Sequence, residues 1–599
     1  MMEKHFTPMG YEAIANLPSD EAEAALNLLS TAEQASVILM TPWERRNEII
    51  LLSHDARKLV QTMPVQELFW TIKATGPQDS LHLLDMATPA QLQFFFDLDW
   101  WDKAELKPGK IVSWILLMYE SGKQVVPAWM AWVAGKDETI LPAFLRMFIR
   151  VFKRPDEMDV QEAGNIFPPF TMDETYYIAF RKEPLLPLWT RFLNDMFDLS
   201  PSLYRDTMET IVWEPSSKNM EDCYRLRNSR MCDHGLPDYY EALDIYAPLP
   251  GNTIRRIAWT MPETGGIADE ELPAFVPTLY LGNFPLLLKA VERLAGTDSM
   301  VRIIREWVGA ANKILMADQV DLDDPDALRD SLIRVAAHLN LGLEIAAGSE
   351  ALTPSETLKS SVLEDLIRSA NIIVRNLSAD CLRLIRQGLV HENLQHIPDH
   401  GIEILRGILS PRPLMWDRSA GNFRSFSSLD DIRTARDIIR KFEAWGRLMA
   451  EILPHWKNWN RELPWNDTNF LHPHEVNWPT GLLTALARRS LGYSLRIRPV
   501  PEERLTELRT KWFGSIQPVS HGAGTVTCPE HVPDDTVEIC ADFLNQAAEQ
   551  AGIGSSLLRS MVRNCLADLY QEWENLPQDQ PIDGRFVSSI MVSLESAKN

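Results

Sequence analysis

Cysteine is scarce in this chain, which has six cysteines in 599 residues, at positions 223, 232, 381, 528, 540 and 565. Chains that depend on disulfides carry cysteines more densely and at tighter spacings. The scarcity excludes a small disulfide-stabilised module and indicates a reducing compartment. We therefore expect a cytoplasmic protein.

Long apolar runs are missing as well. The most apolar stretch, 111–119, ends at Glu120, whereas a membrane-spanning helix needs about 20 residues. The first ten residues include Glu3, Lys4 and His5, and no apolar run of the signal-peptide kind follows them. The sequence predicts neither export nor membrane insertion.

The chain also lacks a basic excess and a phosphate-binding motif. Its 83 acidic and 59 basic residues give a formal charge of -24, which opposes docking on nucleic-acid phosphates or anionic lipid. The pair Gly265-Gly266 and the stretch 521–524 lack the glycine patterns of the Walker A and dinucleotide-binding loops. We expect no nucleic-acid partner and assign no cofactor.

What the chain does contain is the composition of a large folded protein. With 45% hydrophobic and 24% charged residues, 599 residues predict roughly three to four domains of about 150 residues each. The predicted class is mainly α. Changes in pattern predict five regions. They are a helical-repeat domain at 1–104, a helical extension at 105–155, a mixed but mainly helical domain at 156–260, an all-α domain at 261–453, and irregular loops with a C-terminal helical domain at 454–599.

Four proline steps mark an internal repeat near the N-terminus, with separations of 24, 22 and 25 residues at Pro18, Pro42, Pro64 and Pro89. A proline fits the first position of a helix, where its missing N–H costs nothing. Capping boxes are expected where a Ser or Thr precedes a Glu or Gln by three residues. Such pairs are Thr41 with Glu44 and Thr88 with Gln91, and Ser30 with Glu33 marks a further helix start between the proline steps.

Each repeat unit is therefore predicted to be a helical hairpin. Apolar residues recur at helical spacing within these units, for example at Leu81, Leu84, Leu92 and Phe95. One short hairpin cannot bury such a stripe alone, whereas stacked hairpins can. The pattern predicts an N-terminal α-solenoid.

Further along the chain the sequence predicts helices with few strands. Capping boxes are expected at Asp238 with Glu241 and at Thr353 with Glu356, and a core role is expected for Trp129 and Trp132, with a ligand platform as the alternative. The remaining expected elements are strands at 176–180 and 493–498 and helices at 110–120, 124–134, 325–347, 480–491, 536–574 and 584–597.

Three histidine-containing tracts raise the question of a metal site. His391, His396 and His400 lie within ten residues, but Pro398 interrupts the helix that a four-residue spacing would need. The tract therefore favours a polar loop between helices, with metal binding as the alternative. His472 and His474 specify no geometry.

A second candidate set consists of His521, Cys528, His531 and Cys540. It contains one close pair, Cys528 and His531, whereas structural zinc sites have paired knuckles. An ordinary glycine-containing loop is the favoured interpretation, and metal binding remains the alternative.

A thiol nucleophile with a histidine base could be drawn from Cys223, Cys232 and His234, the last preceded by Asp233. Their spacing carries no such information, because catalytic partners meet in space. We interpret the tract as the start of a helix whose aromatic residues pack, and we assign no catalytic residue.

The hairpins at 17–98, with Met63-Pro64-Val65-Gln66-Glu67-Leu68 and Thr88-Pro89-Ala90-Gln91-Leu92, resemble the N-terminal domain of MgtE-type magnesium transporters. The resemblance implies a superhelix of short helices that responds to magnesium. No pore-forming helices accompany it here, so transport is not implied. Glu67 and Asp79 are expected to offset helix dipoles.

The whole chain, including Asp-His-Gly-Leu-Pro-Asp-Tyr-Tyr-Glu-Ala-Leu at 233–243, resembles an uncharacterised family of large bacterial cytoplasmic proteins, a domain of unknown function. The functional prediction is a scaffold or regulatory module that binds a protein partner. A metal- or thiol-dependent enzyme and a divalent-cation sensor are the alternatives. No catalytic, cofactor-binding or metal-binding residue is assigned, and the oligomeric state is left open.

Overall fold

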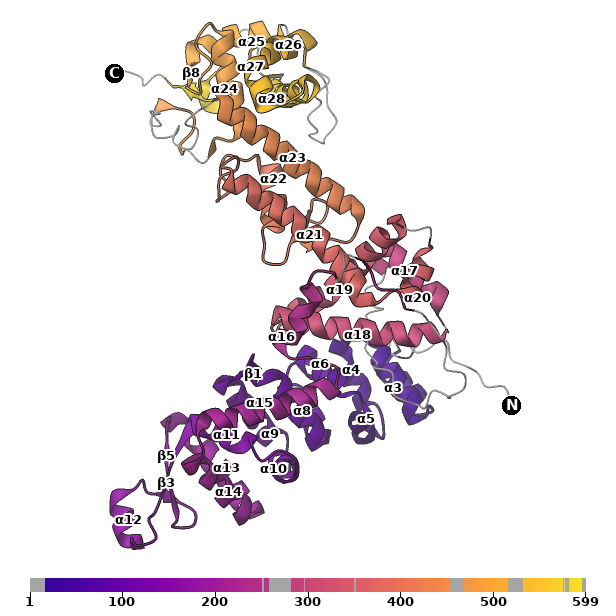
Figure 1. Cartoon of the computed structure of the whole chain (residues 1–599), viewed down its shortest axis with the longest axis vertical. Coiled ribbons are helices and arrows are strands. Elements are labelled where there is room, and N and C mark those ends of the chain that lie inside the picture. The colour runs from indigo at the N-terminus through magenta and orange to yellow at the C-terminus, as the bar shows by residue number, and fades with distance from the viewer. Residues whose placement is uncertain are drawn as a thin grey trace, which may run out of the picture. The chain divides into compact units, whose positions relative to one another are not determined.

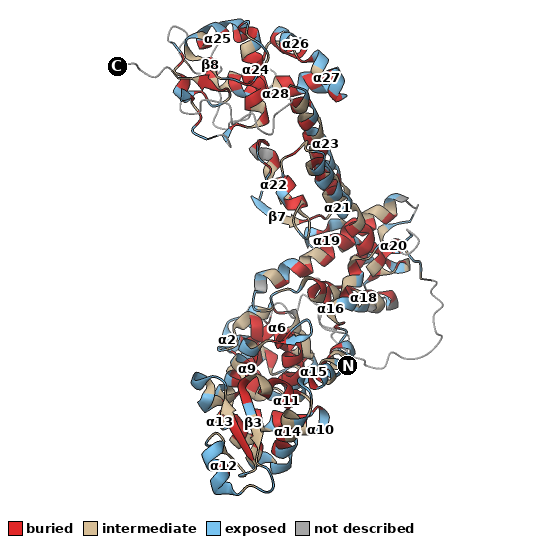
Figure 2. Cartoon of the chain, turned by 60° about the vertical axis from the view of Figure 1, so that its left-hand side comes forward, coloured by how far each residue is buried: buried red, intermediate tan, exposed pale blue. Residues whose placement is uncertain are grey.

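A computed structural model describes residue 14 and residues 17–249, 253–257, 282–295, 297–349, 352–452, 467–472, 475–514, 532–574, 576 and 581–594. The chain forms two compact units, Met1–Ser369 and Ala370–Asn599. Both consist mainly of α-helices with a few short strands, as the sequence predicts. Figure 2 shows that the helices of each unit turn their buried residues inward and their exposed residues outward.

From Ser19 onward, the described part of the first unit opens with a series of short helices, drawn in indigo and violet in Figure 1. They are α2 (Ser19–Leu26), α3 (Thr31–Met40), α4 (Trp43–Leu51), α5 (Ala56–Thr62), α6 (Val65–Thr75), α7 (Leu81–Met86) and α8 (Pro89–Asp99). Each proline step starts a helix: Pro18, Pro42 and Pro64 are the N-caps of α2, α4 and α6, and Pro89 is the first residue of α8.

The capping box predicted at Thr88 is present, and the helix start predicted at Ser30 is confirmed and also forms a capping box, but the box predicted at Thr41 is wrong. The hydroxyl of Thr41 donates to the carbonyl oxygen of Val37 at 2.9 Å, within the preceding helix. The connection between α3 and α4 has only two residues, so Thr41 ends α3 and leaves Pro42 as the N-cap of α4.

Successive hairpins of this array are tied to one another by packing and by side chains. α4 packs against α6, α5 against α7, and α6 against α8. The amide of Asn27 donates to the carbonyl oxygen of Leu52 at 2.8 Å, and that of Gln91 donates to the carbonyl oxygen of Val60 at 2.9 Å. Each hairpin therefore satisfies main-chain groups of a neighbouring one.

A short antiparallel hairpin, β1 (Trp101–Asp102) with β2 (Glu105–Leu106), follows the array. It leads into α9 (Pro108–Ser121), α10 (Val125–Lys136) and α11 (Ile140–Phe148), and then into an antiparallel sheet of order β3-β5-β4. The sheet consists of β3 (Ile149–Lys153), β4 (Phe170–Thr171) and β5 (Tyr176–Phe180), with α12 (Val160–Ile166) between β3 and β4. β5 confirms the strand predicted there.

The rest of the first unit is helical, from η1 (Glu183–Leu185) onward. Its elements are α13 (Leu186–Leu199), α14 (Pro201–Trp213), α15 (Ser216–Asp233), α16 (Tyr239–Ala242), η2 (Leu243–Tyr246), α17 (Pro285–Leu294), α18 (Asp298–Asp318), α19 (Pro325–Ser349) and α20 (Pro354–Ser360). The capping box predicted at Thr353 is present. At α16 the side chain of Asp238 caps the helix, but the predicted reciprocal bond from Glu241 is not among the bonds of the described residues. A side chain at Gly342 of α19 would meet the carbonyl oxygen of Leu366 at 2.3 Å, so glycine permits this close approach.

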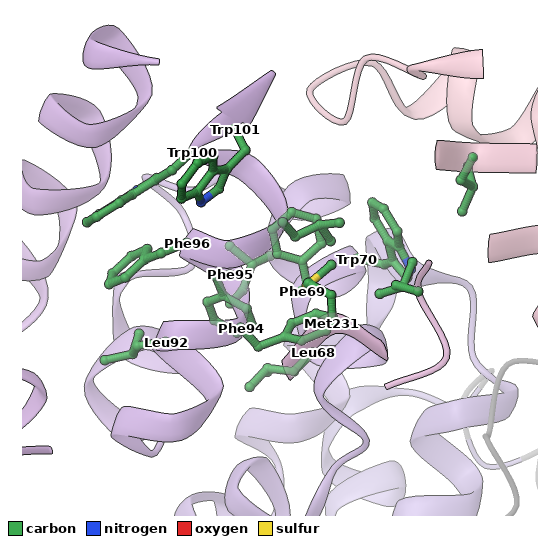
Figure 3. Close-up of a cluster of buried hydrophobic side chains, with 14 of the residues drawn as sticks. Leu68, Phe69, Trp70, Leu92, Phe94, Phe95, Phe96, Trp100, Trp101 and Met231 are labelled. Atoms are coloured by element: carbon green, nitrogen blue, oxygen red, sulfur yellow. The ribbon is translucent and has the colours of Figure 1, made fainter. Parts of the chain in front are cut away.

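Aromatic side chains dominate the core of the first unit. Figure 3 shows Phe69 of α6 and Phe95 and Phe96 of α8 gathered with Met231 of α15. The ring of Trp100 stacks on that of Phe96 at 4.2 Å. Trp129 is fully buried and Trp132 is half-buried, which confirms the core prediction for this pair.

α21 (Leu363–Arg386) starts in the first unit and continues into the second. The second unit then contains α22 (Asp399–Ile408), the hairpin of β6 (Leu414–Asp417) and β7 (Asn422–Ser425), α23 (Leu429–Ile452), α24 (Trp478–Ser490), β8 (Val500–Pro501), η8 (Glu502–Arg504), α25 (Leu505–Phe513), α26 (Asp534–Asp542), α27 (Asn545–Ala551), α28 (Ser555–Glu574), η10 (Gly584–Phe586) and β9 (Val592–Ser593). β8 and β9 pair in parallel.

Two predictions for this unit are wrong. The segment 493–498 is not a strand, because the N–H of Tyr493 returns to the carbonyl oxygen of Arg488 at the end of α24, at 2.9 Å. The segment from Gly584 is helical only as far as Phe586. Beyond it, β9 pairs with β8, and the N–H of Val592 donates to the side chain of Asn469 at 2.8 Å, so tertiary partners replace helical bonds.

Candidate functional site

The histidine tract at 391–400 forms the loop that the sequence favoured, with α22 starting at Asp399. His396 is buried, and its Nδ1 lies 2.8 Å from the carbonyl oxygen of Val476. Its own carbonyl oxygen accepts the N–H of Trp478 at 2.7 Å, while Nδ1 of His391 accepts the N–H of Asn393 at 3.2 Å. Both histidine rings therefore stabilise the loop through hydrogen bonds to main-chain groups. The side chain of His400 lies outside the described residues.

The second histidine–cysteine set is mostly beyond what the structure describes. His521, Cys528 and His531 lie outside the described residues, as does His474. Cys540 is buried in α26, and burial raises the pKa of its thiol to about 12. In the described part of the chain, no group of three or more His, Cys, Asp or Glu side chains is placed to hold a metal ion.

The thiol candidates near residue 230 are not brought together as a nucleophile and base. Burial raises the pKa of the Cys223 thiol, the opposite of what a reactive thiolate needs. Cys232 is exposed, and the ring of His234 packs edge-on against Phe94 at 4.8 Å. The packing interpretation is therefore confirmed for His234, but Asp233 and His234 end α15, the next helix starts only at Tyr239, and Tyr240 is 67% exposed, so it is wrong for Tyr240.

Sequence reasoning missed a cavity of about 510 Å³ in the first unit. It lies where the array, the β1–β2 hairpin, α15, α16 and the α18–α19 connection meet. Its walls are formed by Trp70, Leu98, Asp99, Trp101, Asp102, Lys103, Lys107, Lys110, Arg227, Leu236, Tyr239, Leu315, Met316, Gln319, Val320, Asp321, Leu322 and Asp323. A volume of this size suits a small organic molecule.

One side of the cavity carries an alternating network of charges. The ammonium group of Lys73, 5% exposed, lies 2.7 Å from the carboxylate of Asp99 and also contacts Asp323. Lys110 binds the same two carboxylates, with 3.3 Å to Asp99. The indole N–H of Trp114 donates to Asp99 at 2.7 Å. Asp323, half-exposed on the α18–α19 connection, thus closes this network.

The pKa values of the network follow from these contacts. Burial alone would lower the pKa of Lys110, but the hydrogen bond and charge of Asp323 and the charge of Asp99 outweigh it and raise that pKa. Burial alone would raise the pKa of Asp323, yet the bonds from Lys110 and Lys73 lower it. Lys110 and Asp323 are therefore both held in their charged forms around neutral pH.

The other side of the cavity combines aromatic surface with cations. The ammonium group of Lys103 lies over the ring of Tyr239 at 5.1 Å, and the guanidinium of Arg227 over that of Trp101 at 5.5 Å. Among the described residues, neither Lys103 nor Lys107 has a carboxylate partner. The indole Nε1 of Trp101 is buried, and it too has no hydrogen-bond partner within the described part.

The sequence carried only a weak signal for this site. A stretch of eight residues holds three lysines, Lys103, Lys107 and Lys110, although the whole chain is strongly acidic. This stretch follows Trp100-Trp101. Trp70, Leu98, Asp99 and Asp102 lie nearby in the sequence, but the other walls come from residues 227–239 and 315–323, more than a hundred positions away. No local pattern indicates which distant segments fold against one another.

His338 of α19 is a buried titratable group away from the cavity, with no hydrogen bond at Nδ1 to any described residue. Burial and then the charge of Arg334 lower its pKa to about 3. The unfolded chain binds a proton below about pH 6.5 and the folded chain does not, so stability is complete above that pH and decreases as pH falls.

We expect the free energy of unfolding to fall by up to about 1.4 kcal/mol per pH unit below pH 6.5 through this residue. Urea denaturation at pH 7 and pH 5 measures the effect, and His338→Leu should reduce the difference between the two pH values. The exposed histidine variant His54→Leu is the control and should keep the wild-type difference. An unchanged difference in His338→Leu would contradict the prediction.

The fold and the cavity define a mainly α-helical protein with an N-terminal array of short hairpins and an internal mixed-charge cavity. No described helix is both long enough and apolar enough to cross a membrane. The chain belongs to the family described as "Family of unknown function (DUF6178)", whose model matches residues 23–593. No curated protein and no solved structure matches the chain.

Proposed function

We propose that the chain is a regulatory scaffold whose N-terminal array, α2–α8, binds a protein partner. The observation that carries the proposal is the repeated packing of each hairpin on its neighbours, with side-chain bonds from one hairpin to main-chain groups of another. Such packing is typical of α-solenoids, which present extended surfaces to proteins. The sequence resemblance to the N-terminal domain of MgtE-type magnesium transporters predicts the same stacking of short hairpins.

Two exposed leucines on adjacent turns give the array an apolar patch. Leu28 is 87% exposed in the turn after α2, and Leu51 is 52% exposed at the end of α4. The turns are neighbours because Asn27 donates to the carbonyl oxygen of Leu52 and accepts the N–H of His54 at 2.9 Å. Large apolar side chains with this exposure are common in interfaces.

The surroundings of the patch indicate the chemistry of the partner. Glu23 is exposed on α2 near the turn that carries Leu28, and Asp20 and Glu21 are exposed in the first turn of the same helix. An apolar patch with an acidic border complements a protein surface that has an apolar centre and a basic rim. We therefore propose a partner of that kind, bound more weakly as salt concentration rises.

The test is capture of partners from cells that express the protein at its natural level, followed by titration of the purified partner. The double variant Leu28→Glu/Leu51→Glu should bind it at least about tenfold more weakly, a loss of about 1.4 kcal/mol, with an unchanged circular dichroism spectrum. Phe586→Glu is the matched control, because Phe586 is 77% exposed in the second unit. Equal affinity of the double variant and the wild type would refute the proposal.

A further inference from the structure

The cavity of the first unit supports an inference that is independent of the proposed partner surface. Its volume of about 510 Å³ falls in the range of small-molecule sites. The charge network uses Lys73 and Lys110, whereas Lys103, Lys107 and Arg227 form no ion pair with a carboxylate among the described residues. Three such cations around one cavity are unexpected in a chain of charge -24.

The aromatic lining adds a second requirement for a ligand. Trp70, Trp101 and Tyr239 line the cavity; Tyr239 is half-buried, whereas the first two, 6% and 5% exposed, offer the cavity little ring surface. Flat aromatic surfaces bind planar rings by offset or edge-to-face stacking. A ligand that uses both the rings and the cations therefore has a planar group and an anionic group.

The cavity also has a hydrogen-bond acceptor in its wall. The indole N–H of Trp101 has no exposed surface and no described partner, so a ligand in the cavity does not reach it. Asp102, whose carboxylate accepts the amide of Gln319 at 3.1 Å, supplies an acceptor for sugar hydroxyls or ring N–H groups.

We propose that this cavity binds a nucleoside monophosphate, with the base against the aromatic walls and the phosphate at Lys103 and Lys107. Lys and Arg recognise phosphate through charge-assisted hydrogen bonds. Binding requires no glycine-rich loop, because side-chain cations here take the place of main-chain N–H groups. The carboxylate of Asp323 lies on the same cavity wall and opposes the anion.

Isothermal titration calorimetry on the full-length protein with adenosine 5′-monophosphate tests the proposal. We expect one site per chain, with binding to adenosine, ribose 5-phosphate and inorganic phosphate each at least about tenfold weaker. The first compound lacks the charge and the other two lack the ring. Equal binding of any of the three, or no binding of the monophosphate at millimolar concentration, would overturn the proposal.

Three variants place the binding in this cavity. Lys107→Glu should weaken it at least about tenfold, and Asp323→Asn should strengthen it, because the first adds and the second removes a negative charge at the wall. Lys123→Glu, an exposed lysine in the turn between α9 and α10, is the matched control and should bind like the wild type. Thermal melts verify folding. Unchanged affinity in Lys107→Glu, or equal weakening in Lys123→Glu, would overturn the proposal.

Discussion

Replacing Glu67 with alanine is expected to lower the free energy of unfolding by about 3–5 kcal/mol. Glu67 of α6 forms an ion pair with Arg46 of α4, and the two side chains are 1% and 3% exposed. Arg46 also donates to the carbonyl oxygen of Thr41 at 2.8 Å. The substitution leaves a buried guanidinium charge without its carboxylate, and this unpaired charge accounts for the expected loss of stability.

Urea denaturation of the full chain, combined with hydrogen exchange of peptides from α4 and α6, measures the loss and places it in the array. The matched control is Asp85→Ala, which removes the exposed ion pair of Arg57 with Asp85, 57% and 43% exposed and 2.7 Å long. Exposed pairs contribute at most about 1 kcal/mol. A Glu67→Ala variant as stable as the Asp85→Ala variant would show that the buried pair does not hold α4 and α6 together.

The second large effect is expected for Trp100→Ala, with a loss of about 3–5 kcal/mol. Trp100 is fully buried, stacks on Phe96 at 4.2 Å and meets Phe144 edge-on at 5.5 Å. Its indole Nε1 has no hydrogen-bond partner among the described residues, so the loss comes from packing and from the cavity left behind.

Guanidinium denaturation followed by far-ultraviolet circular dichroism measures this loss without depending on tryptophan fluorescence. Trp213→Ala is the control, because Trp213 is 69% exposed and its removal should change stability by at most about 0.5 kcal/mol. If the two variants lost the same stability, the aromatic cluster around Trp100 would not be the structural centre of the first unit.

Local signals predicted the helices of the array well. The helix start at Ser30 and the boxes at Thr88 and Thr353 formed as expected because their bonds join residues three positions apart and need no distant partner. The strand at 176–180 was also predicted, since it is a short apolar, aromatic-rich run between turn residues. The capping bonds come from sequence neighbours, whereas the strand is held by its ladder with β3 and β4, and only its apolar pattern was local.

Predictions failed where a distant partner or a short connection decided the structure. Thr41 serves the helix before it because two residues join α3 and α4. Val592 pairs with Val500 and with Asn469, over separations that no local pattern reveals. Glu67 does lie in the first turn of α6, as expected, but its main role is the buried pair with Arg46.

The sequence by itself determined the mainly α-helical class, the starts of the array helices and the loop at 391–398, because capping, proline geometry and apolar spacing act over a few residues. Only the tertiary structure decided which charges became buried and where a cavity formed. The walls of that cavity come from residues 70–110, 227–239 and 315–323. Their proximity results from the packing of whole helices, which is a property of the folded unit and not of any single segment.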